Sequence, residues 1–386
     1  MKKKKLRKKA KSSLIILLLC ALSAIAGFYI QRKKNYVNEY VKVVYKTVNT
    51  EVINKASMVM VGDALIHMPI NNSHKSGSGY DFKGIFKYIK PIVSEYDLKY
   101  YNQETILGGT SLGLSGYPQF NSPQQVGDAF RDAGFNLVSL ATNHSMDNYY
   151  RTGGKTIKNS TEYWKKYADN VIAAGSYNSK EDRDAEIIKE VNGIKYAFLS
   201  YTEQTNGISV PSGKSYLVNV YSKDKVKKDV EKYKDKVDLI IVAMHWGEEY
   251  THYPNSSQKE KAKYLASLGV NIIVGCHPHV IQPMTYIGDT LVVYSLGNFV
   301  SNQDTVAKLT GLMASANIVK RTYHGKTTVK IEDATAEFIY TRKSEKYVVY
   351  PYSKLNNNIL SGYKNYYEKY KKVIKSMSDK ITVKGL

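Results

Sequence analysis

The sequence predicts an α/β protein, and three observations support this class. From about residue 55 to residue 280, short apolar runs typical of strands alternate with stretches of helical periodicity. After Val280 the pattern changes to strands that follow one another directly. Residues able to bind metals come immediately after the predicted strands, where open α/β sheets bind their ligands.

The strands and helices can be placed from their apolar patterns. The strands that alternate with helices are predicted at Ser57–Val61, Asp97–Tyr101, Asn136–Ala141, Asp238–Met244 and Asn271–Val274. The helices are predicted at Phe82–Glu95, Pro123–Ala133, Gly154–Tyr167, Lys223–Tyr233 and Ser257–Leu268. Gly134 and Gly269 stand where helix ends belong. The later strands are expected at Ile281–Ile287, Thr290–Tyr294, Ala314–Lys320 and Thr328–Tyr340.

The N-terminal segment predicts a membrane anchor. Ser12–Ile30 is uncharged and apolar, and its length is close to the roughly 20 residues that cross a bilayer. Eight Lys or Arg residues precede it and three follow it, which favours a cytoplasmic N-terminus and an extracellular main domain. A cleaved signal peptide is the alternative, because Ala24-Ile25-Ala26 has the small residues of a cleavage site. The long apolar core and the basic residues 31–34 favour retention at the cell membrane of a bacterium.

Four parts of the chain follow from these patterns. Residues 1–34 form a basic tail and a transmembrane anchor, and residues 35–55 form a stalk. Residues 56–340 form the main domain, and residues 341–386 form a Lys/Tyr-rich extension that we expect to be peripheral, with a helix at Leu360–Lys375.

The charge and the cysteines restrict the partners and the stabilising bonds. Residues 1–34 supply eleven of the net charge of +22, so the rest of the chain carries +11. This bias makes an anionic surface polymer a plausible partner, with general solubility as the alternative, and the lack of an arginine-rich tract argues against nucleic acid. Cys20 and Cys276 are the only cysteines and cannot form a disulfide framework.

A set of potential metal ligands follows the predicted strands in order. Its members are Asp63, Glu104, Asn143, His144, His245, His277 and His279. Carboxylates, imidazoles and an amide carbonyl together suit Mn, Fe, Zn or Ni. Two such ions about 3.5–4 Å apart can turn a bound water into a nucleophile for displacement at phosphorus. We therefore predict a phosphoesterase-type site, whereas His74 and His324 fall outside this pattern and are expected at the surface.

Six motifs in order carry a resemblance to a known family. They are Gly62-Asp63, Asn102-Gln103-Glu104, Ala141-Thr142-Asn143-His144-x-x-Asp147, His245-Trp246-Gly247-x-Glu249, Gly275-x-His277-Pro278-His279 and Ser295-Leu296-Gly297-Asn298-Phe299. Over about residues 55–302 the chain resembles the CapA family of poly-γ-glutamate capsule synthesis proteins, a branch of the calcineurin-like metallophosphoesterases. The resemblance implies a four-layer αββα sandwich with its site at the strand ends.

The resemblance also implies roles for individual residues. Asp63 and His279 would bind one metal ion, Glu104 would bridge two ions, and the second ion would be held by Asn143, His245 and His277. His144 would protonate a leaving oxygen. Apart from the resemblance, the position of Asp147 shortly after His144 suggests that it could orient that histidine, and Arg151 is a candidate anion clamp with a plain surface role as the alternative.

Two positions depart from the wider phosphoesterase pattern. Leu65 stands where a histidine of an Asp-x-His motif is usual, so either His67 or a water molecule would complete the metal shell. Glu104 stands in place of the usual aspartate and is one methylene longer, which could alter the spacing of the metals.

Four further residues near the motifs have expected roles. Trp246 is expected to pack in the core, and Cys276 is expected to be a buried thiol that points away from the metals. Asn298 is expected mainly to satisfy backbone groups. Glu249 could orient a ligand imidazole or lie at the surface.

Two functions from different classes are compatible with the sequence. The first is a metal-dependent hydrolase or transferase that acts outside the membrane on an anionic polymer or a phosphoester. The second is an accessory protein that binds, exports or tethers poly-γ-glutamate or a similar polymer, together with other membrane subunits of polymer synthesis.

Overall fold

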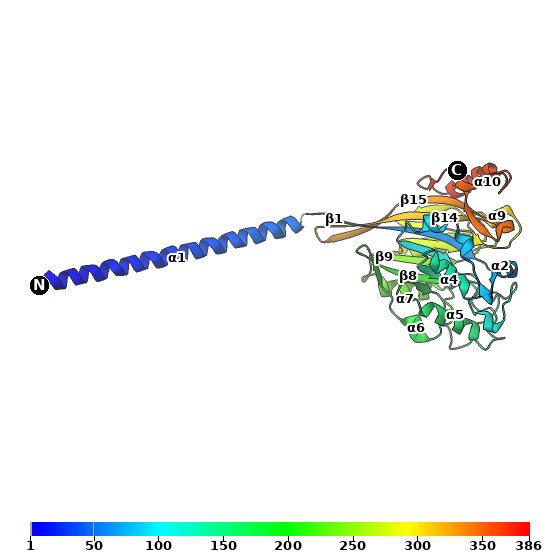
Figure 1. Ribbon diagram of the computed structural model, residues 1–386, viewed down its shortest axis with the longest axis horizontal. Coiled ribbons are helices and arrows are strands. Elements are labelled where there is room, and N and C mark those ends of the chain that lie inside the picture. The colour runs from blue at the N-terminus through cyan, green and yellow to red at the C-terminus, as the bar shows by residue number, and fades with distance from the viewer. Residues whose placement is uncertain (1, 49) are drawn as a thin grey trace. The chain divides into compact units, whose positions relative to one another are not determined.

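The protein is described here by a computed structural model that covers residues 2–48 and 50–386. The chain divides into two compact units (Figure 1). One unit contains Met1–Ile53 and Arg321–Thr328, and the other contains Asn54–Lys320 and Val329–Leu386. Asn49 in the predicted stalk lies outside the described residues.

The first unit is dominated by helix α1 (Lys2–Val48). Within it, Lys9–Val43 contains a stretch long and apolar enough to cross a membrane. The apolar side chains of the predicted span, such as Leu14, Leu18 and Ile25, are exposed along the helix. A signal sequence would have the same length and composition, so retention and orientation stay predictions.

The second unit contains two large sheets. The first has nine strands, with the order β16-β15-β14-β1-β4-β5-β6, and β13 and β17 pair with β1 and β15. Strands β1, β4, β5 and β6 run parallel. The bounds are β1 Val52–Ala64, β4 Leu98–Asn102, β5 Leu137–Ser139, β6 Ile172–Ala174, β13 Asn298–Val300, β14 Thr310–Tyr323, β15 Lys326–Arg342, β16 Val348–Pro351 and β17 Thr382–Val383.

The second sheet has six strands, with the order β11-β12-β10-β9-β8-β7. Strands β8, β9, β10 and β12 run parallel, and β7 and β11 are antiparallel edge strands. The bounds are β7 Lys189–Val191, β8 Ile194–Thr202, β9 Leu239–His245, β10 Ile272–Cys276, β11 Met284–Ile287 and β12 Thr290–Val293. A separate small hairpin pairs β2 (Lys75–Ser76) with β3 (Gly79–Tyr80).

The helices are mostly short and connect the strands. The α-helices after α1 are α2 Met68–Ser73, α3 Lys90–Val93, α4 Gln125–Asp132, α5 Lys155–Lys165, α6 Lys180–Asp184, α7 Lys223–Tyr233, α8 Ser256–Ser267, α9 Val306–Leu309 and α10 Tyr363–Lys375. The 3₁₀ helices are η1 Lys83–Phe86, η2 Thr110–Leu112, η3 Lys343–Glu345 and η4 Tyr352–Lys354. Helix α8 begins with a capping box between Asn255 and Gln258, which satisfies backbone N–H groups of its first turn.

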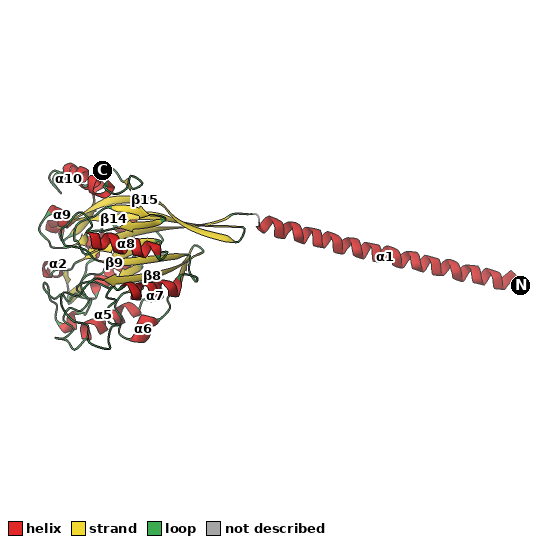
Figure 2. Cartoon of the chain, turned by 180° about the vertical axis from the view of Figure 1, so that it is seen from behind, coloured by secondary structure: helices red, strands yellow, loops and turns green. Residues whose placement is uncertain are grey.

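Alternate residues of each sheet enter different apolar cores, which defines the layers of this unit. Met60 and Ile241, one from each sheet, pack in the core between the two sheets. On the outer face of the nine-stranded sheet, Val61 packs with Phe130 of α4. On the outer face of the six-stranded sheet, Val242 packs with residues of α7 and α8. The unit is thus a helix–sheet–sheet–helix sandwich, which confirms the predicted fold class. Figure 2 shows its strands in yellow, with helix α10 above them and helix α5 below them in the view.

One predicted helix and the predicted peripheral extension differ from the structure. The helix expected at Phe82–Glu95 is divided into η1 and α3. Pro91 has no N–H to donate, and its ring would clash with the carbonyl four residues earlier in a continuous helix. The C-terminal extension packs into the core between the sheets through buried Tyr352, Tyr370 and Ile374. Its strands β16 and β17 also pair with β15. These residues are therefore an integral part of the sandwich.

Candidate metal centre

Asp63 occupies the middle of a row of polar residues at the end of the nine-stranded sheet. It pairs in register with Asn102 at the end of β4 and with Asn298 at the start of β13. Its Oδ1 accepts a hydrogen bond from Asn102 Nδ2 at 2.7 Å. The side chain of Asp63 is completely buried, so its position is set by these neighbouring strands.

Close backbone packing against Gly297 fixes the position of the Asp63 backbone. Its N–H donates to the carbonyl of Gly297 at 3.0 Å. A Cβ atom at Gly62 would lie 1.8 Å from that same carbonyl oxygen, so this position requires glycine for the close approach. The motif Gly62-Asp63 is therefore explained by backbone contact as well as by chemistry.

The histidines of the centre come from the six-stranded sheet. His245 is the last residue of β9 and pairs in register with Cys276, the last residue of β10. His277 and His279 follow directly and have positive φ angles of 98° and 56°. Such angles are unfavourable for non-glycine residues and are typical of functional sites. Side chains from both sheets thus meet at one edge of the sandwich.

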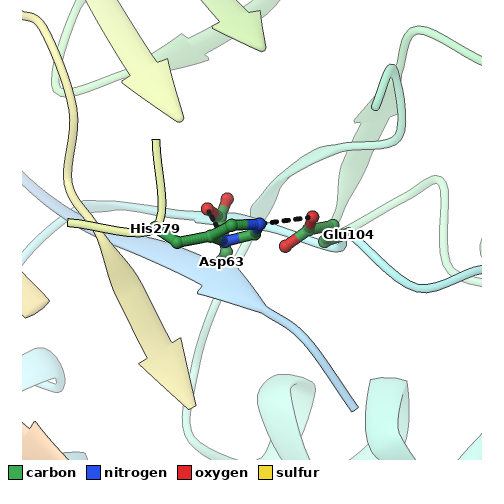
Figure 3. Close-up of side chains that lie close together, drawn as sticks. All are labelled: Asp63, Glu104 and His279. Carbon is green, nitrogen blue, oxygen red and sulfur yellow. Dashed lines mark ion pairs between the residues drawn. The ribbon is translucent and has the colours of Figure 1, made fainter. Parts of the chain in front are cut away.

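Asp63, Glu104 and His279 form a compact, buried cluster (Figure 3). The Nε2 atom of His279 lies 3.6 Å from Glu104 Oε1, and its Nδ1 atom lies 3.5 Å from Asp63 Oδ2. One ligand atom from each residue falls within 4.8 Å of the others. Figure 3 shows the imidazole between the two carboxylates, an arrangement that one or two cations could share.

The buried carboxylate of Glu104 has His279 as an ion-pair partner but lacks hydrogen-bond donors among the described residues. Both of its oxygens are buried, and neither accepts a hydrogen bond from a group in the described part of the chain. Burial raises the pKa of Glu104 well above its usual value, since the charge is removed from water. A buried carboxylate with two free oxygens is costly unless it is protonated or bound to a positive ion.

A second group of potential ligands lies beside the first. His245 Nε2 lies 2.9 Å from Asn143 Oδ1, and the rings of His245 and His277 are 4.8 Å apart. Burial, followed by the charge of His277, lowers the pKa of His245 well below its usual value. Burial and the charge of His279 likewise lower the pKa of His277 to about 4. Neutral imidazoles are the form that binds metals.

His279 is affected in the opposite direction. Burial alone would lower its pKa, but the carboxylates of Glu104 and Asp63 raise it to about 9. Its Nδ1 also lies 3.0 Å from Asn298 Oδ1. The two carboxylates therefore favour the protonated form of the His279 imidazole.

His144 and Asp147 lie within hydrogen-bonding distance of each other next to these ligands. His144 Nδ1 lies 2.7 Å from Asp147 Oδ2, which also accepts the backbone N–H of Phe120 at 2.6 Å. The ring of Phe120 packs edge-on against His144 at 4.7 Å. Burial raises the pKa of Asp147. Asp147 is thus placed where it could orient His144, and the role predicted for it stays a prediction.

Two predicted site residues lie beside the cluster instead of within it. His67 Nδ1 contacts the carbonyl of Leu65 at 3.1 Å and the N–H of Asn302 at 3.3 Å, and burial lowers its pKa to about 4. Among the described residues, His67 does not join the group formed by Asp63, Glu104 and His279. The guanidinium of Arg151 is exposed and donates to Asn148 Oδ1 at 2.7 Å.

Sequence reasoning did not predict that three asparagines would contact the predicted ligands. Asn102 Nδ2 contacts both Asp63 and His245, at 2.7 and 3.3 Å. Asn298 orients His279, in addition to binding backbone carbonyls as expected. Asn206 contacts Asn143 and His144 from the loop after β8. The signal for Asn102 and Asn298 was their place inside two of the motifs, whereas Asn206 lies outside every motif.

The remaining expectations near the centre have mixed outcomes. Trp246 is fully buried and donates to the carbonyl of Tyr294 at 2.9 Å, as expected of a packing residue. Cys276 is buried against Tyr100 in the core between the two sheets, as expected of a buried thiol, and burial raises its pKa. Glu249 is exposed.

The two histidines left outside the pattern also differ from each other. His324 is exposed as expected. The expectation for His74 was wrong, because its ring is buried and stacks on Phe82 at 5.0 Å, which removes it from the surface.

Comparison with known proteins identifies the family. The sequence pattern of the family described as "Bacterial capsule synthesis protein PGA_cap" matches residues 57–303. The Capsule biosynthesis protein CapA of Bacillus anthracis is 29% identical over 317 residues, which cover 78% of this chain and 71% of that protein. The PGA biosynthesis protein CapA of Bacillus subtilis strain 168 is 27% identical over 228 residues, which cover 57% of each chain.

Solved structures with some similarity include a putative nucleotidase and a calcineurin-like phosphoesterase. A putative 5'-nucleotidase from Staphylococcus aureus has a TM-score of 0.45 and 14% identity, covering 81% of this chain and 58% of its own. The calcineurin-like phosphoesterase YfkN from Bacillus subtilis has a TM-score of 0.44 and 13% identity, covering 74% of this chain and 91% of its own. At these scores the fold assignment rests on the two sheets themselves. Because the family pattern matches more than half of the chain, the chain belongs to the bacterial capsule synthesis protein family PGA_cap.

Proposed function

We propose that this protein acts in the synthesis of a bacterial capsule or a related anionic surface polymer through a metal-dependent, hydrolase-type site. In this proposal it is anchored in the cell membrane by α1, with its sandwich domain outside and with other membrane subunits of polymer synthesis as partners. The observation that carries the proposal is the buried Glu104 carboxylate, whose two oxygens accept no hydrogen bond from the described residues and which lies beside Asp63 and His279.

The donor set suits divalent ions such as Mn, Fe, Zn or Ni. Asp63, Glu104 and His279 would hold one ion, and Asn143, His245 and His277 would hold a second, with Glu104 between the two. When bound, such ions lower the pKa of a coordinated water and polarise the oxygens of a phosphoester. The in-register asparagines Asn102 and Asn298 would keep Asp63 and His279 in the orientation that binding needs.

His144 would hold the proton for the leaving group. Its Nδ1 is engaged by Asp147 at 2.7 Å, so its Nε2 is the atom available to a substrate. The buried Asp147 and the edge-on ring of Phe120 hold the imidazole in one orientation. An imidazole held in this way can deliver a proton to an oxygen as the bond to it breaks.

Elemental analysis of the full-length protein in detergent micelles tests the proposal. Wild-type protein dialysed against Mn²⁺ is expected to retain about two ions per chain and to hydrolyse bis(p-nitrophenyl) phosphate. Glu104→Gln keeps the size of the side chain but removes its charge, and it should lower the metal content and the turnover together. The matched control is His324→Asn, which changes an exposed histidine and keeps a residue that tolerates positive φ. Wild-type protein that binds no metal above the level of Glu104→Gln would contradict the proposal.

The second candidate is a non-catalytic polymer-binding protein. The net charge of +11 outside residues 1–34 favours it, since a basic surface attracts polyanions. This candidate predicts polymer binding that weakens with salt and survives the double substitution His245→Ala and His277→Ala, without any metal-dependent turnover.

A further inference from the structure

Tyr250 places an aromatic ring against one of the predicted metal ligands. It lies in the loop between β9 and α8, and its ring stacks on the His279 imidazole with the centroids 6.0 Å apart and the planes inclined by 29°. Aromatic rings attract each other in offset arrangements at such separations. Because 48% of its surface remains exposed, Tyr250 contributes less to the stability of the fold than a core residue does.

The backbone conformation of Tyr250 is unusual for a bulky residue. Its φ angle is 67°, in the left-handed region that favours glycine and asparagine. The two ligands of the adjoining segment, His277 and His279, share this property. Such conformations cost free energy and are kept where a side chain has to be placed at a functional site. Backbone geometry alone would favour glycine at position 250, so the aromatic side chain is the feature that needs an explanation.

Two hydrogen bonds hold the loop against the segment of His279 without using the Tyr250 ring. The N–H of Tyr250 donates to the carbonyl of Pro278 at 2.7 Å. Gln282 Nε2 donates to the carbonyl of the next loop residue, Thr251, at 2.8 Å. The ring can therefore be changed by substitution while these bonds keep the loop in place.

A third segment of the chain restrains both the ring and the imidazole. Lys308 Nζ lies 4.1 Å from the centroid of the Tyr250 ring, within the range of a cation–π contact. The carbonyl of Lys308 accepts a hydrogen bond from Asn298 Nδ2 at 2.8 Å, and Asn298 Oδ1 lies 3.0 Å from His279 Nδ1. The imidazole thus meets Asn298 at its edge and Tyr250 in a stacked contact.

We infer that Tyr250 is a positioning residue that acts through His279. Its ring, held by Lys308, keeps the imidazole in the orientation that binds a metal ion and excludes water beside it. The inference rests on the proposed function, because it requires an ion bound by His279. An imidazole that is already restrained at its edge and by stacking loses less freedom when the ion binds, which strengthens binding.

Titration of the metal-depleted, full-length protein in detergent micelles with Co²⁺ tests the inference. The visible absorption of bound Co²⁺ reports both its affinity and its coordination geometry. Tyr250→Asn removes the ring but keeps a residue that tolerates positive φ, and it should weaken Co²⁺ binding about threefold to tenfold. It should also lower the molar absorption of the bound ion, because additional water raises the coordination number.

Three further variants separate the ring from other causes. Tyr250→Phe keeps the ring and should match the wild type in affinity and in spectrum. Lys308→Met removes the cation above the ring and should weaken Co²⁺ binding by about twofold. The matched control is Tyr253→Asn, which makes the same change at a tyrosine of the same loop that is 57% exposed and should alter neither quantity.

Three outcomes would overturn the inference. An unchanged affinity and spectrum in Tyr250→Asn would show that the ring is not needed. Equal changes in Tyr250→Phe and Tyr250→Asn would assign the effect to the hydroxyl, and equal changes in Tyr253→Asn and Tyr250→Asn would assign it to the loop as a whole. Wild-type protein that binds no Co²⁺ would instead contradict the proposed function, and with it the ion that this inference requires.

Discussion

Asp63 is the side chain that connects the two groups of potential ligands. Its Oδ1 is bound by Asn102, which also contacts His245. Its Oδ2 accepts the N–H of His277 at 3.3 Å and lies near His279. One buried carboxylate thus contacts residues of both sheets, and its loss would disturb both groups of ligands at once.

The convergence of Asp63, Glu104, His245 and His279 could be predicted from their places after strands, because the carboxyl ends of parallel strands share an edge. Asn206 could not be predicted in this way. It reaches the centre from a loop without regular structure, and asparagine is common in such loops for reasons of backbone conformation alone. The metal-ligand roles of these residues stay predictions.

The opposite pKa shifts of the histidines predict a stability maximum for the metal-depleted protein near pH 6.5. The pKa of about 4 for His277 and His67 lies below the unfolded value, so stability is complete above pH 6.5 and falls as the pH drops towards 4. The pKa of about 9 for His279 lies above the unfolded value, so its contribution is complete below pH 6.5 and is lost as the pH rises through 9. Each shift corresponds to roughly 3 kcal/mol.

Thermal melting of the full-length protein between pH 4 and pH 9.5 measures this maximum. His279→Gln should remove most of the decline on the alkaline side, and His277→Gln should remove part of the decline on the acid side. A melting temperature that rises steadily from pH 6.5 to pH 9 in metal-depleted wild-type protein would show that His279 is not held between two carboxylates.

At the scale of secondary structure, the long apolar strands could be predicted better than the short elements. Strand β6 (Ile172–Ala174) has too few residues to show a period, and β8 (Ile194–Thr202) was not distinguished by its apolar pattern. Helix α10 was expected, but its burial was not. Its buried face includes Tyr367 and Tyr370. In a Lys-rich helix the sequence alone does not distinguish a buried tyrosine from an exposed one, because tyrosine has both an apolar ring and a polar tip.

Gly275→Ala is expected to prevent stable folding. A Cβ atom there would lie 2.0 Å from the carbonyl oxygen of Tyr294 in the neighbouring β-structure, and backbone atoms cannot move away cheaply. The expected result is aggregation on expression or a melting temperature lower by at least about 10 °C. The control is Gly84→Ala, where the added Cβ meets nothing within 4 Å. Equal melting temperatures for the two variants would contradict the close contact.

A chain truncated after Tyr340 is expected to be insoluble. The deletion removes β16, α10 and β17 and exposes the core that Tyr352 and Ile374 cover. Exposing this apolar surface to water would cost a free energy comparable to the roughly 5–15 kcal/mol by which a folded domain is stable. Removal of Gly385 and Leu386 alone should have no effect, since both are exposed. Solubility and circular dichroism distinguish the two chains, and a well-folded short form would indicate a separable extension.

For the whole molecule, the class of fold could be predicted because the alternation of strands and helices covers most of the chain. The pairing of fifteen strands into two sheets could not, since it depends on contacts between segments far apart in sequence. The predicted membrane anchor also concerns the whole molecule, because its orientation would determine on which side of the membrane the sandwich domain lies.

Mass spectrometry of the protein purified from membranes should find residues 1–34 still attached. The long apolar span with basic flanks favours retention over cleavage. Brief treatment of intact cells lacking a cell wall with trypsin should remove the sandwich domain and leave a membrane-bound N-terminal fragment. A mature chain that begins shortly after Ala26 would instead identify a signal peptide.

The edge where the two sheets meet has a mechanical consequence. Asp63 and Glu104 are carried by one sheet, whereas His245, His277 and His279 are carried by the other. Any sliding of one sheet across the apolar layer between them would change several carboxylate–imidazole distances together. A metal ion bound by ligands from both sheets would cross-link them. Metal binding would therefore also restrict the sliding of one sheet over the other.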